Sequence, residues 1–295
     1  MAASEALEGV ALTLADVAGG MLLSAGAGWN QTPGDWAFFI EHGHAIGFKT
    51  ASGLLVATAA ALAYGGGFGW VSMVLVSPDW RHRGLASLLV DSCVKRLQAL
   101  QVTPVLDATP AGQPVYRHLG FNVGFEFERW ERTVGPDLSA ATRGADASAV
   151  DAPDPGPIRI ADRSDLDTIA GLDQAATGIG RRALLQDMLA RPGTAAWIAR
   201  DGSGFALVRA GHRATQLGPL AAADPAQAIA LLGNALRART GALFLDVPMR
   251  WRELAAWLEQ RGFARQRPFA RMALGAAAPF ACGDRSFALA GPEFG

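Results

Sequence analysis

The segment from Val74 to Val90 most constrains the fold, because it joins an apolar run, a turn and an apolar helical pattern. The run predicts a strand that stops at Pro78, and the residues after Gly84 have helical spacing. This order directs unpaired backbone N–H groups and the positive end of a helix dipole toward one point, where phosphate can bind. Arg81 and Arg83 add positive charge there, and Gly84 leaves room for a ligand.

The chain of 295 residues is long enough for two domains, and 50% of its residues are hydrophobic, so it can bury substantial cores. Its formal net charge of -1 gives no general attraction to nucleic acid or to an anionic membrane, and we expect neither as a partner. No secretory signal is recognisable, and no apolar run approaches the ~20 residues of a membrane span. Two distant cysteines, Cys93 and Cys282, suit a reducing cytoplasm.

Composition divides the chain into two halves. Residues 134–157 are dominated by small residues, Asp and Pro and nearly lack large apolar residues, which is typical of a linker. We therefore predict a first domain over 1–133, a second domain over 158–275, and a tail over 276–295 that packs loosely on the second domain.

Hydrophobic periodicity predicts a mixed sheet with helices on its faces for the first half, which is the α/β (α+β) class. Thr32 or Asp35 is expected to cap a short helix, and Gly120 to follow the end of another. The predicted helices cover 12–23, 35–42, 85–100 and 114–119, and the predicted strands cover 45–48, 53–63, 69–76, 105–108 and 121–130.

The second half weakly repeats the first. Leu106-Asp107-Ala108-Thr109-Pro110 precedes a Leu-Gly-Phe sequence, and Leu245-Asp246-Val247-Pro248 precedes an Arg-Gly-Phe sequence. Because the order and the motif positions agree, we favour a duplicated fold over coincidence. The second half is predicted to have strands at 196–198, 205–209 and 214–217, a break at 218–220 and a helix at 226–239.

Two motifs resemble signatures of the GNAT superfamily of N-acetyltransferases. Arg81-His82-Arg83-Gly84-Leu85-Ala86 fits its Arg/Gln-x-x-Gly-x-Gly/Ala pattern between a strand and a helix. Tyr116 lies a few residues ahead of Gly120-Phe121, as in the family's second signature. This resemblance covers roughly residues 12–132. The second half resembles the second domain of tandem-GNAT proteins, but residues 220–227 replace the phosphate loop and contain neither a basic residue nor a glycine.

The resemblance implies two GNAT-like domains, each a mixed, mostly antiparallel twisted sheet flanked by helices. It also implies transfer of an acetyl group from acetyl-coenzyme A to a primary amine of a small molecule by direct attack. The pantetheine arm would pair with the edge of the strand that precedes the loop, and a second copy of the chain is an expected partner for assembly. The implied coenzyme contacts are Met73, Val74, Leu75, Val76, Arg81, His82, Arg83, Gly84, Leu85, Ala86 and Ser87.

Two residues are implied in proton transfer. The family commonly uses a tyrosine at the position of Tyr116 to protonate the leaving thiolate, and a phenol with a pKa near ~10 suits that role; otherwise Tyr116 packs beneath the coenzyme. Asp107 ends a strand beside the acetyl site, so its carboxylate would take the proton of the amine or bind the substrate ammonium. Equally, the Asp107 side chain would order the turn that follows it.

In GNAT folds the loop between the first two helices covers the acceptor site. This implies that Trp29, Asn30, Gln31 and Thr109 contact the substrate, although Trp29 would alternatively anchor the loop in the core. No cluster of His, Cys and carboxylate residues has metal-ligand spacing, so we expect no metal. The other functions considered are an acyl-CoA-binding sensor without turnover and a P-loop nucleotide site, which the missing Gly-Lys-Ser/Thr ending disfavours.

Overall fold

The same succession of elements occurs twice in the chain: a strand, two helices, three strands, a helix, a strand, a helix and a strand. The computed structural model describes residues 6–133, 157–237, 239, 241–275 and 283–295. The first half contains β1 (Leu7–Ala11), η1 (Leu14–Asp16), α1 (Val17–Gly26), α2 (Pro33–His42), β2 (His44–Thr50), β3 (Leu55–Ala63), β4 (Phe68–Val76), η2 (Pro78–Trp80), α3 (Leu85–Ala99), β5 (Thr103–Ala108), α4 (Gln113–His118) and β6 (Phe121–Arg132).

The second half repeats this succession and adds one short strand at its end. It contains β7 (Ile158–Ile160), η3 (Arg163–Asp165), α6 (Leu166–Thr177), α7 (Arg182–Ala190), β8 (Ala195–Ala199), β9 (Phe205–Arg209), β10 (Thr215–Ala221), α8 (Pro225–Arg237), β11 (Leu243–Pro248), α9 (Arg252–Glu259), β12 (Ala264–Leu274) and β13 (Ser286–Ala288). The predicted linker lies outside the described residues up to 156.

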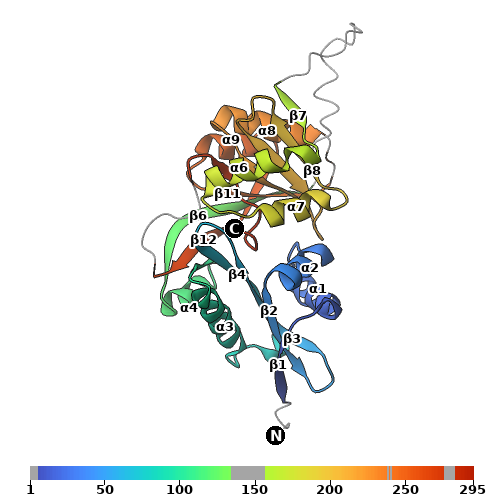
Figure 1. The fold of residues 1–295 in the computed structure, drawn as a ribbon, viewed down its shortest axis with the longest axis vertical. Coiled ribbons are helices and arrows are strands. Elements are labelled where there is room, and N and C mark those ends of the chain that lie inside the picture. The colour runs from blue at the N-terminus through green and yellow to red at the C-terminus, as the bar shows by residue number, and fades with distance from the viewer. Residues whose placement is uncertain (1–5, 134–156, 238, 240, 276–282) are drawn as a thin grey trace.

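The two halves exchange their last strands. The described strands form one sheet in the order β1-β2-β3-β4-β5-β12-β6-β11-β10-β9-β8-β7, with β13 beside β10 (Figure 1). Strand β12 therefore lies between β5 and β6, and β6 lies between β12 and β11. At the centre of the exchange Phe127 faces Phe269, and their rings stack with centroids 5.0 Å apart. Each half thus completes the sheet of the other.

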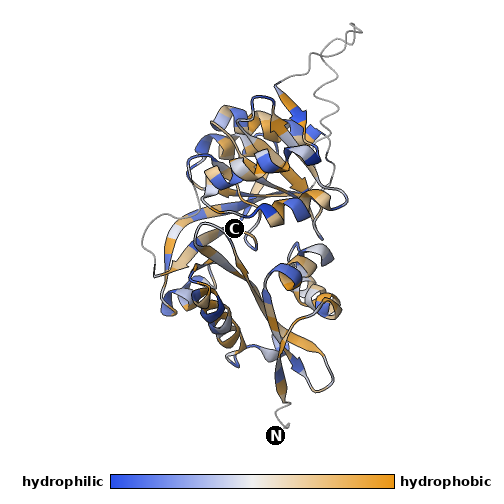
Figure 2. Cartoon of the chain, in the orientation of Figure 1, coloured by the Kyte–Doolittle hydropathy of each residue, from blue (hydrophilic) through white to orange (hydrophobic). Residues whose placement is uncertain are grey.

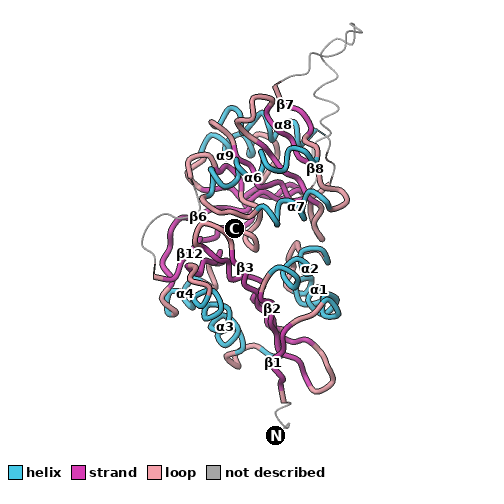
Figure 3. The backbone as a smooth tube through the Cα atoms, in the orientation of Figure 1, coloured by secondary structure: helices cyan, strands magenta, loops and turns pink. Residues whose placement is uncertain are grey.

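Helices cover both faces of this mostly antiparallel sheet (Figure 3). In α3 and α8 buried hydrophobic residues recur at helical spacing between hydrophilic ones (Figure 2), so one side of each of these helices packs on the sheet. One core cluster spans both halves and joins Trp36 and Phe39 of α2 with Leu184 of α7 and Phe205 of β9. Separate clusters lie under α3 and under α8.

The predicted cap of α2 and the predicted end of α4 are confirmed. Thr32 is the N-cap of α2, and its backbone N–H donates to Asp35 Oδ2 at 2.7 Å while Asp35 N–H donates to Thr32 Oγ1 at 3.2 Å. Gly120 follows α4 with a φ of 89°, a conformation that favours glycine. Cys93 of α3 is fully buried. Among the described helices, none is long and apolar enough to cross a bilayer.

Three expectations need correction. Strand β1 was not predicted, because it is a partly exposed edge strand without clear alternation. Strand β10 does not break at Gly218-Pro219 but forms a bulge there, and its pairing with β9 resumes at Leu220. The described part of the tail, residues 283–295, does not pack loosely: Phe287, Leu289 and Phe294 are fully buried, and Phe294 stacks on Phe39 of the first half at 5.0 Å.

Candidate functional site

Strands β4 and β5 separate near the middle of the first half. Their parallel pairing covers Phe68–Trp70 and Thr103–Val105, although both strands continue further. At the point of divergence Met73 and Val74 lie opposite the single residue Ala59 of β3, which is a β-bulge, and Met73 has a φ of 54°. Thr58 Oγ1 donates to the carbonyl oxygen of Met73 at 2.8 Å and fixes the bulge.

The divergence leaves a cavity of about 150 Å³ between the two halves of the chain. Among the residues predicted from sequence, it brings together Trp29, Asn30, Gln31, Met73, Val74, Asp107, Thr109 and Tyr116. The sequence motifs do not mark the remaining lining residues, which are Val71, Ser72, Leu106, Ala108, Gly112, Arg129, Arg267, Phe269, Pro292 and Glu293. Several of these residues come from the exchanged strands and the tail.

The predicted phosphate loop lies between β4 and α3, outside the lining of the cavity. Gly84 is the N-cap of α3 with a φ of 75°, and a Cβ placed there would meet no atom within 4 Å. The intrahelical ladder starts with Leu88 N–H, which donates to Gly84 O at 3.1 Å, so the three preceding amides belong to the open first turn. Arg83 lies over the Trp80 ring at 4.5 Å, and Arg81 Nε donates to Val76 O at 3.3 Å.

Tyr116 projects from α4 into the wall of the cavity. Its ring packs edge-on against Phe121, with centroids 6.1 Å apart. A Cβ at Gly112 would lie 3.0 Å from the Tyr116 ring, so a side chain there would push the ring aside. Burial raises the pKa of Tyr116, which keeps the phenol protonated near neutral pH.

Asp107 forms a buried ion pair with Arg271 of the exchanged strand β12. Arg271 Nε and a terminal nitrogen donate to the two carboxylate oxygens at 2.8 Å each, and both side chains are fully buried. Burial raises the pKa of Asp107, whereas the Arg271 guanidinium opposes this rise. The proton-accepting role of Asp107 stays a prediction, and its geometry favours holding β12 beside β5.

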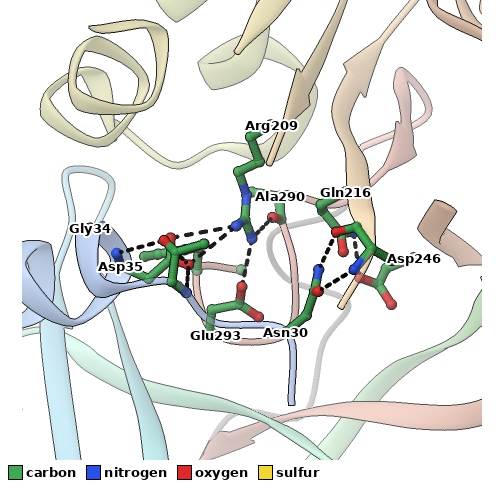
Figure 4. A network of polar contacts seen from close by, with 12 residues as sticks. Asn30, Gly34, Asp35, Arg209, Gln216, Asp246, Ala290 and Glu293 are labelled. Carbon is green, nitrogen blue, oxygen red and sulfur yellow. Dashed lines mark hydrogen bonds and ion pairs between the residues drawn. The ribbon is translucent and has the colours of Figure 1, made fainter. Parts of the chain in front are cut away.

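The loop between α1 and α2 is tied to the second half by Asn30. Its Oδ1 accepts from the backbone N–H groups of Arg213 and Ala214 at 2.9 Å each, and its Nδ2 donates to Ala214 O at 3.0 Å (Figure 4). By contrast, the buried Gln31 Oε1 and Ser72 Oγ have no hydrogen-bond partner among the described residues. These two groups line the cavity and are free to meet a ligand.

Glu293 brings a buried carboxylate from the tail to the cavity. Its Oε1 accepts from Arg209 at 2.6 Å, and Arg209 lies 3.4 Å from Asp35 (Figure 4). Asp35 in turn pairs with Arg191 at 2.5 Å. Burial raises the pKa of Glu293 although Arg209 opposes the rise. No motif surrounds Glu293 in the sequence, so only the folded tail identifies it.

In the second half, the corresponding divergence of strands is filled by the chain itself. Strands β10 and β11 pair in parallel only at Thr215–Leu217 and Leu243–Leu245. Strand β13 pairs with β10 beyond this point, and Leu289 N–H donates to Asp246 O of β11 at 2.9 Å. A Cβ at Gly218 would overlap the carbonyl oxygen of Leu289, so glycine permits this close approach.

The second half also lacks the tyrosine of the first. Tyr116 is five residues before Phe121, whereas Leu258 is five residues before Phe263. Leu258 is buried in the core beneath α8 and α9 and has no proton to donate.

Two family models match the chain, each for an acetyltransferase (GNAT) domain, at residues 36–123 and 169–284. The chain therefore belongs to the GNAT acetyltransferases and carries two GNAT domains in tandem, as the repeated succession of elements indicates. A search of curated proteins with the sequence finds no match.

Solved structures share the fold at low sequence identity. A protein from Pyrococcus horikoshii, described as a candidate acetyltransferase, has a TM-score of 0.79 and 16% identity, and the match covers 98% of this chain and 96% of that chain. A GCN5-related N-acetyltransferase from Sphaerobacter thermophilus has a TM-score of 0.60 and 14% identity, with 90% and 95% covered. A tandem GNAT protein from the clavulanic acid biosynthesis pathway has a TM-score of 0.60 and 14% identity, with 92% and 100% covered.

Proposed function

We propose that the first half transfers an acetyl group from acetyl-CoA to a primary amine of a small molecule by direct attack. The observation that carries this proposal is the cavity at the divergence of β4 and β5, with Tyr116 in its wall. Its volume of about 150 Å³ suits a small acceptor. When bound, acetyl-CoA supplies the acetyl group as a thioester.

The residues of the first half fit acetyl-CoA. The open space at Gly84 and the first-turn amides of α3 suit the pyrophosphate, with Arg81 and Arg83 beside them. The unpartnered Ser72 Oγ beside the bulge and the free edge of β4 suit the amide groups of pantetheine. A main-chain N–H at the Met73 bulge would stabilise the negative charge that develops on the carbonyl oxygen.

Tyr116 would donate the proton that the sulfur needs when the carbon–sulfur bond breaks. Its raised pKa keeps this proton available near neutral pH, which supports the role of general acid. The attacking amine must in turn lose a proton as the carbon–nitrogen bond forms. We propose Glu293 as the acceptor of that proton, because both oxygens of Asp107 already accept from Arg271.

We further propose that the second half does not bind acyl-CoA. Strand β13 occupies the gap between β10 and β11, the loop glycine and basic residues are missing, and Leu258 replaces the tyrosine. The second half instead supports the site through β12 and the tail, which bring Arg267, Phe269 and Glu293 to the cavity.

The experiment is thiol release from acetyl-CoA with a panel of small amines, using wild type, Gly84→Glu and Gly53→Glu. Gly84 and Gly53 have φ values of 75° and 84°, and both face open space, so the two variants carry similar backbone strain. We expect turnover in wild type and Gly53→Glu and none in Gly84→Glu, because the carboxylate would occupy the phosphate position. Saturable acetyl-CoA binding without turnover across the panel would indicate a sensor, and unchanged activity of Gly84→Glu would refute the coenzyme site.

A further inference from the structure

Arg267 differs from the other charged residues that line the cavity, because it forms no ion pair with a described residue. Among the described residues that line the cavity, Asp107 pairs with Arg271, Arg129 pairs with Asp246, and Glu293 pairs with Arg209. Arg267 of β12 also lines the cavity, and no described carboxylate lies within ion-pair distance of it. Arg267 is therefore the one charged residue in this described lining that has no ion-pair partner.

Arg267 sits in an environment that disfavours an unpaired charge. The residue is half-buried, its guanidinium lies 4.9 Å from the centroid of the Phe269 ring, and its Nε is buried without a hydrogen-bond partner. Burial and the nearby Arg129 lower the pKa of Arg267 below its usual range. An arginine stays protonated near neutral pH even so, and a half-buried cation is more stable with an anionic partner than without one. A bound anion would supply that partner.

The pairing of the exchanged strands does not require an arginine here. Phe127 and Phe269 face each other and occupy equivalent positions in the two exchanged strands. Two residues after them, Arg129 is equivalent to Arg271. Two residues before them, Phe125 is equivalent to Arg267. The first half thus has a phenylalanine at the equivalent position. Arg267 therefore belongs to the part of the sheet that faces the cavity. Its planar guanidinium can donate two parallel hydrogen bonds, a geometry that matches a carboxylate.

Groups that accept hydrogen bonds face the same cavity. Gln31 is 6% exposed, and its Oε1 has no hydrogen-bond partner among the described residues. The Glu293 carboxylate, 7% exposed, provides a negative charge. Together with Arg267, these groups complement a molecule that carries both an amine and an anionic group.

We propose that the acceptor is an amino acid, a small primary amine that carries a carboxylate. Arg267 binds the carboxylate, while Glu293 and Gln31 Oε1 receive the N–H groups of the amine. This inference rests on the proposed acetyl transfer and names its acceptor class. The phosphate loop does not line the cavity, so Arg267 is assigned to the acceptor and not to the coenzyme phosphates.

The test compares amino acids with their carboxamides, which keep the amine and the side chain but lose the negative charge. Wild type, Arg267→Gln and Arg267→Lys are assayed by thiol release, with Arg265→Gln as the matched control. Arg265 lies on the same strand but is exposed and outside the cavity. We expect Arg267→Gln to raise the KM for amino acids by about 10–100-fold, the value of a hydrogen-bonded charge, with little change for carboxamides. Arg267→Lys should retain part of the preference for amino acids over carboxamides, and Arg265→Gln should retain all of it.

Calorimetry gives a second readout, because amino acid binding to the coenzyme A-loaded protein should weaken in Arg267→Gln. Equal use of amino acids and carboxamides by wild type would overturn the inference while leaving acetyl transfer intact. An equal loss for both acceptors in Arg267→Gln, or a raised KM for acetyl-CoA alone, would overturn it as well. Absence of thiol release with every amine would instead refute the proposed function and the acceptor class with it. Circular dichroism confirms that each variant is folded.

Discussion

Asp107 and Arg271 lie 164 residues apart in the sequence, yet they form a bidentate ion pair in which both nitrogen–oxygen distances are 2.8 Å. The pair has a counterpart in the other half, where Arg129 donates to Asp246 at 2.8 and 2.7 Å. In each pair the arginine comes from a strand that the other half has contributed. Two related ion pairs therefore hold the exchanged strands in place, and each contributes one residue, Asp107 or Arg129, to the cavity wall.

Removal of Arg271 should destabilise the protein strongly. Arg271→Met leaves the Asp107 carboxylate buried without its partner, and we expect the free energy of unfolding to fall by about 3–5 kcal/mol. The double variant Asp107→Asn/Arg271→Met should lose much less than the sum of the two single variants. Denaturant unfolding of the wild type, the two single variants and the double variant measures this coupling. Additive losses of unfolding free energy would show that the two side chains do not stabilise the fold as a pair.

Replacement of Tyr116 by phenylalanine should lower kcat and leave the KM for acetyl-CoA nearly unchanged. The phenol would act only as the thiolate leaves, and general acids contribute about 10²–10⁴-fold to rates. Tyr64→Phe is the control, because Tyr64 is the other of the two tyrosines in the chain and does not line the cavity. A Tyr116→Phe enzyme with the wild-type kcat would restrict Tyr116 to packing.

The pH dependence of kcat/KM should report Glu293. A proton-accepting Glu293 must be ionised, and burial raises its pKa, so activity should fall as the pH drops through this raised value. The midpoint of the acid limb of the profile should therefore lie above the reference glutamate pKa of about 4.3. Glu293→Gln should abolish this limb and lower kcat, whereas Asp107→Asn, assayed while folded, should retain the limb. The reverse pattern would assign the proton to Asp107.

Asp35 should stabilise the protein in a pH-dependent way. Burial alone would raise the pKa of Asp35, but Arg209 and Arg191 hold it below its usual value. Ionised Asp35 therefore stabilises the fold above the unfolded pKa of ~3.9, and this contribution is lost as the pH falls through the lower folded pKa. Asp35→Asn should cost about 3–5 kcal/mol near neutral pH and progressively less below about pH 4. Urea unfolding at several pH values measures the difference, and a constant difference would contradict this account.

The elements of the first half were largely predictable because their signals are local. The helix after Gly84 has buried residues at helical spacing, and Thr32 with Asp35 forms a capping box that the sequence displays. The repeated Asp107 and Asp246 also indicated duplication correctly. The helix and the capping box depend on residues within a few positions of each other, and periodicity reports such features well.

The strand exchange and the origin of parts of the cavity wall were not predictable in the same way. Arg267 and Glu293 reach the cavity through β12 and the tail, and only tertiary pairing decides where these segments lie. One signal was present: Phe127-Glu128-Arg129 and Phe269-Ala270-Arg271 repeat the same spacing, and this repeat marks the two exchanged strands. The bulge at Gly218-Pro219 resembles a strand break, because glycine and proline normally end strands.

The central claim is that one half of a tandem GNAT protein binds the coenzyme while the other half is closed by its own chain. Isothermal titration of acetyl-CoA into the wild-type protein tests this claim most directly. We predict saturable binding with a stoichiometry of one acetyl-CoA per chain. Two sites per chain, or no binding, would contradict the account.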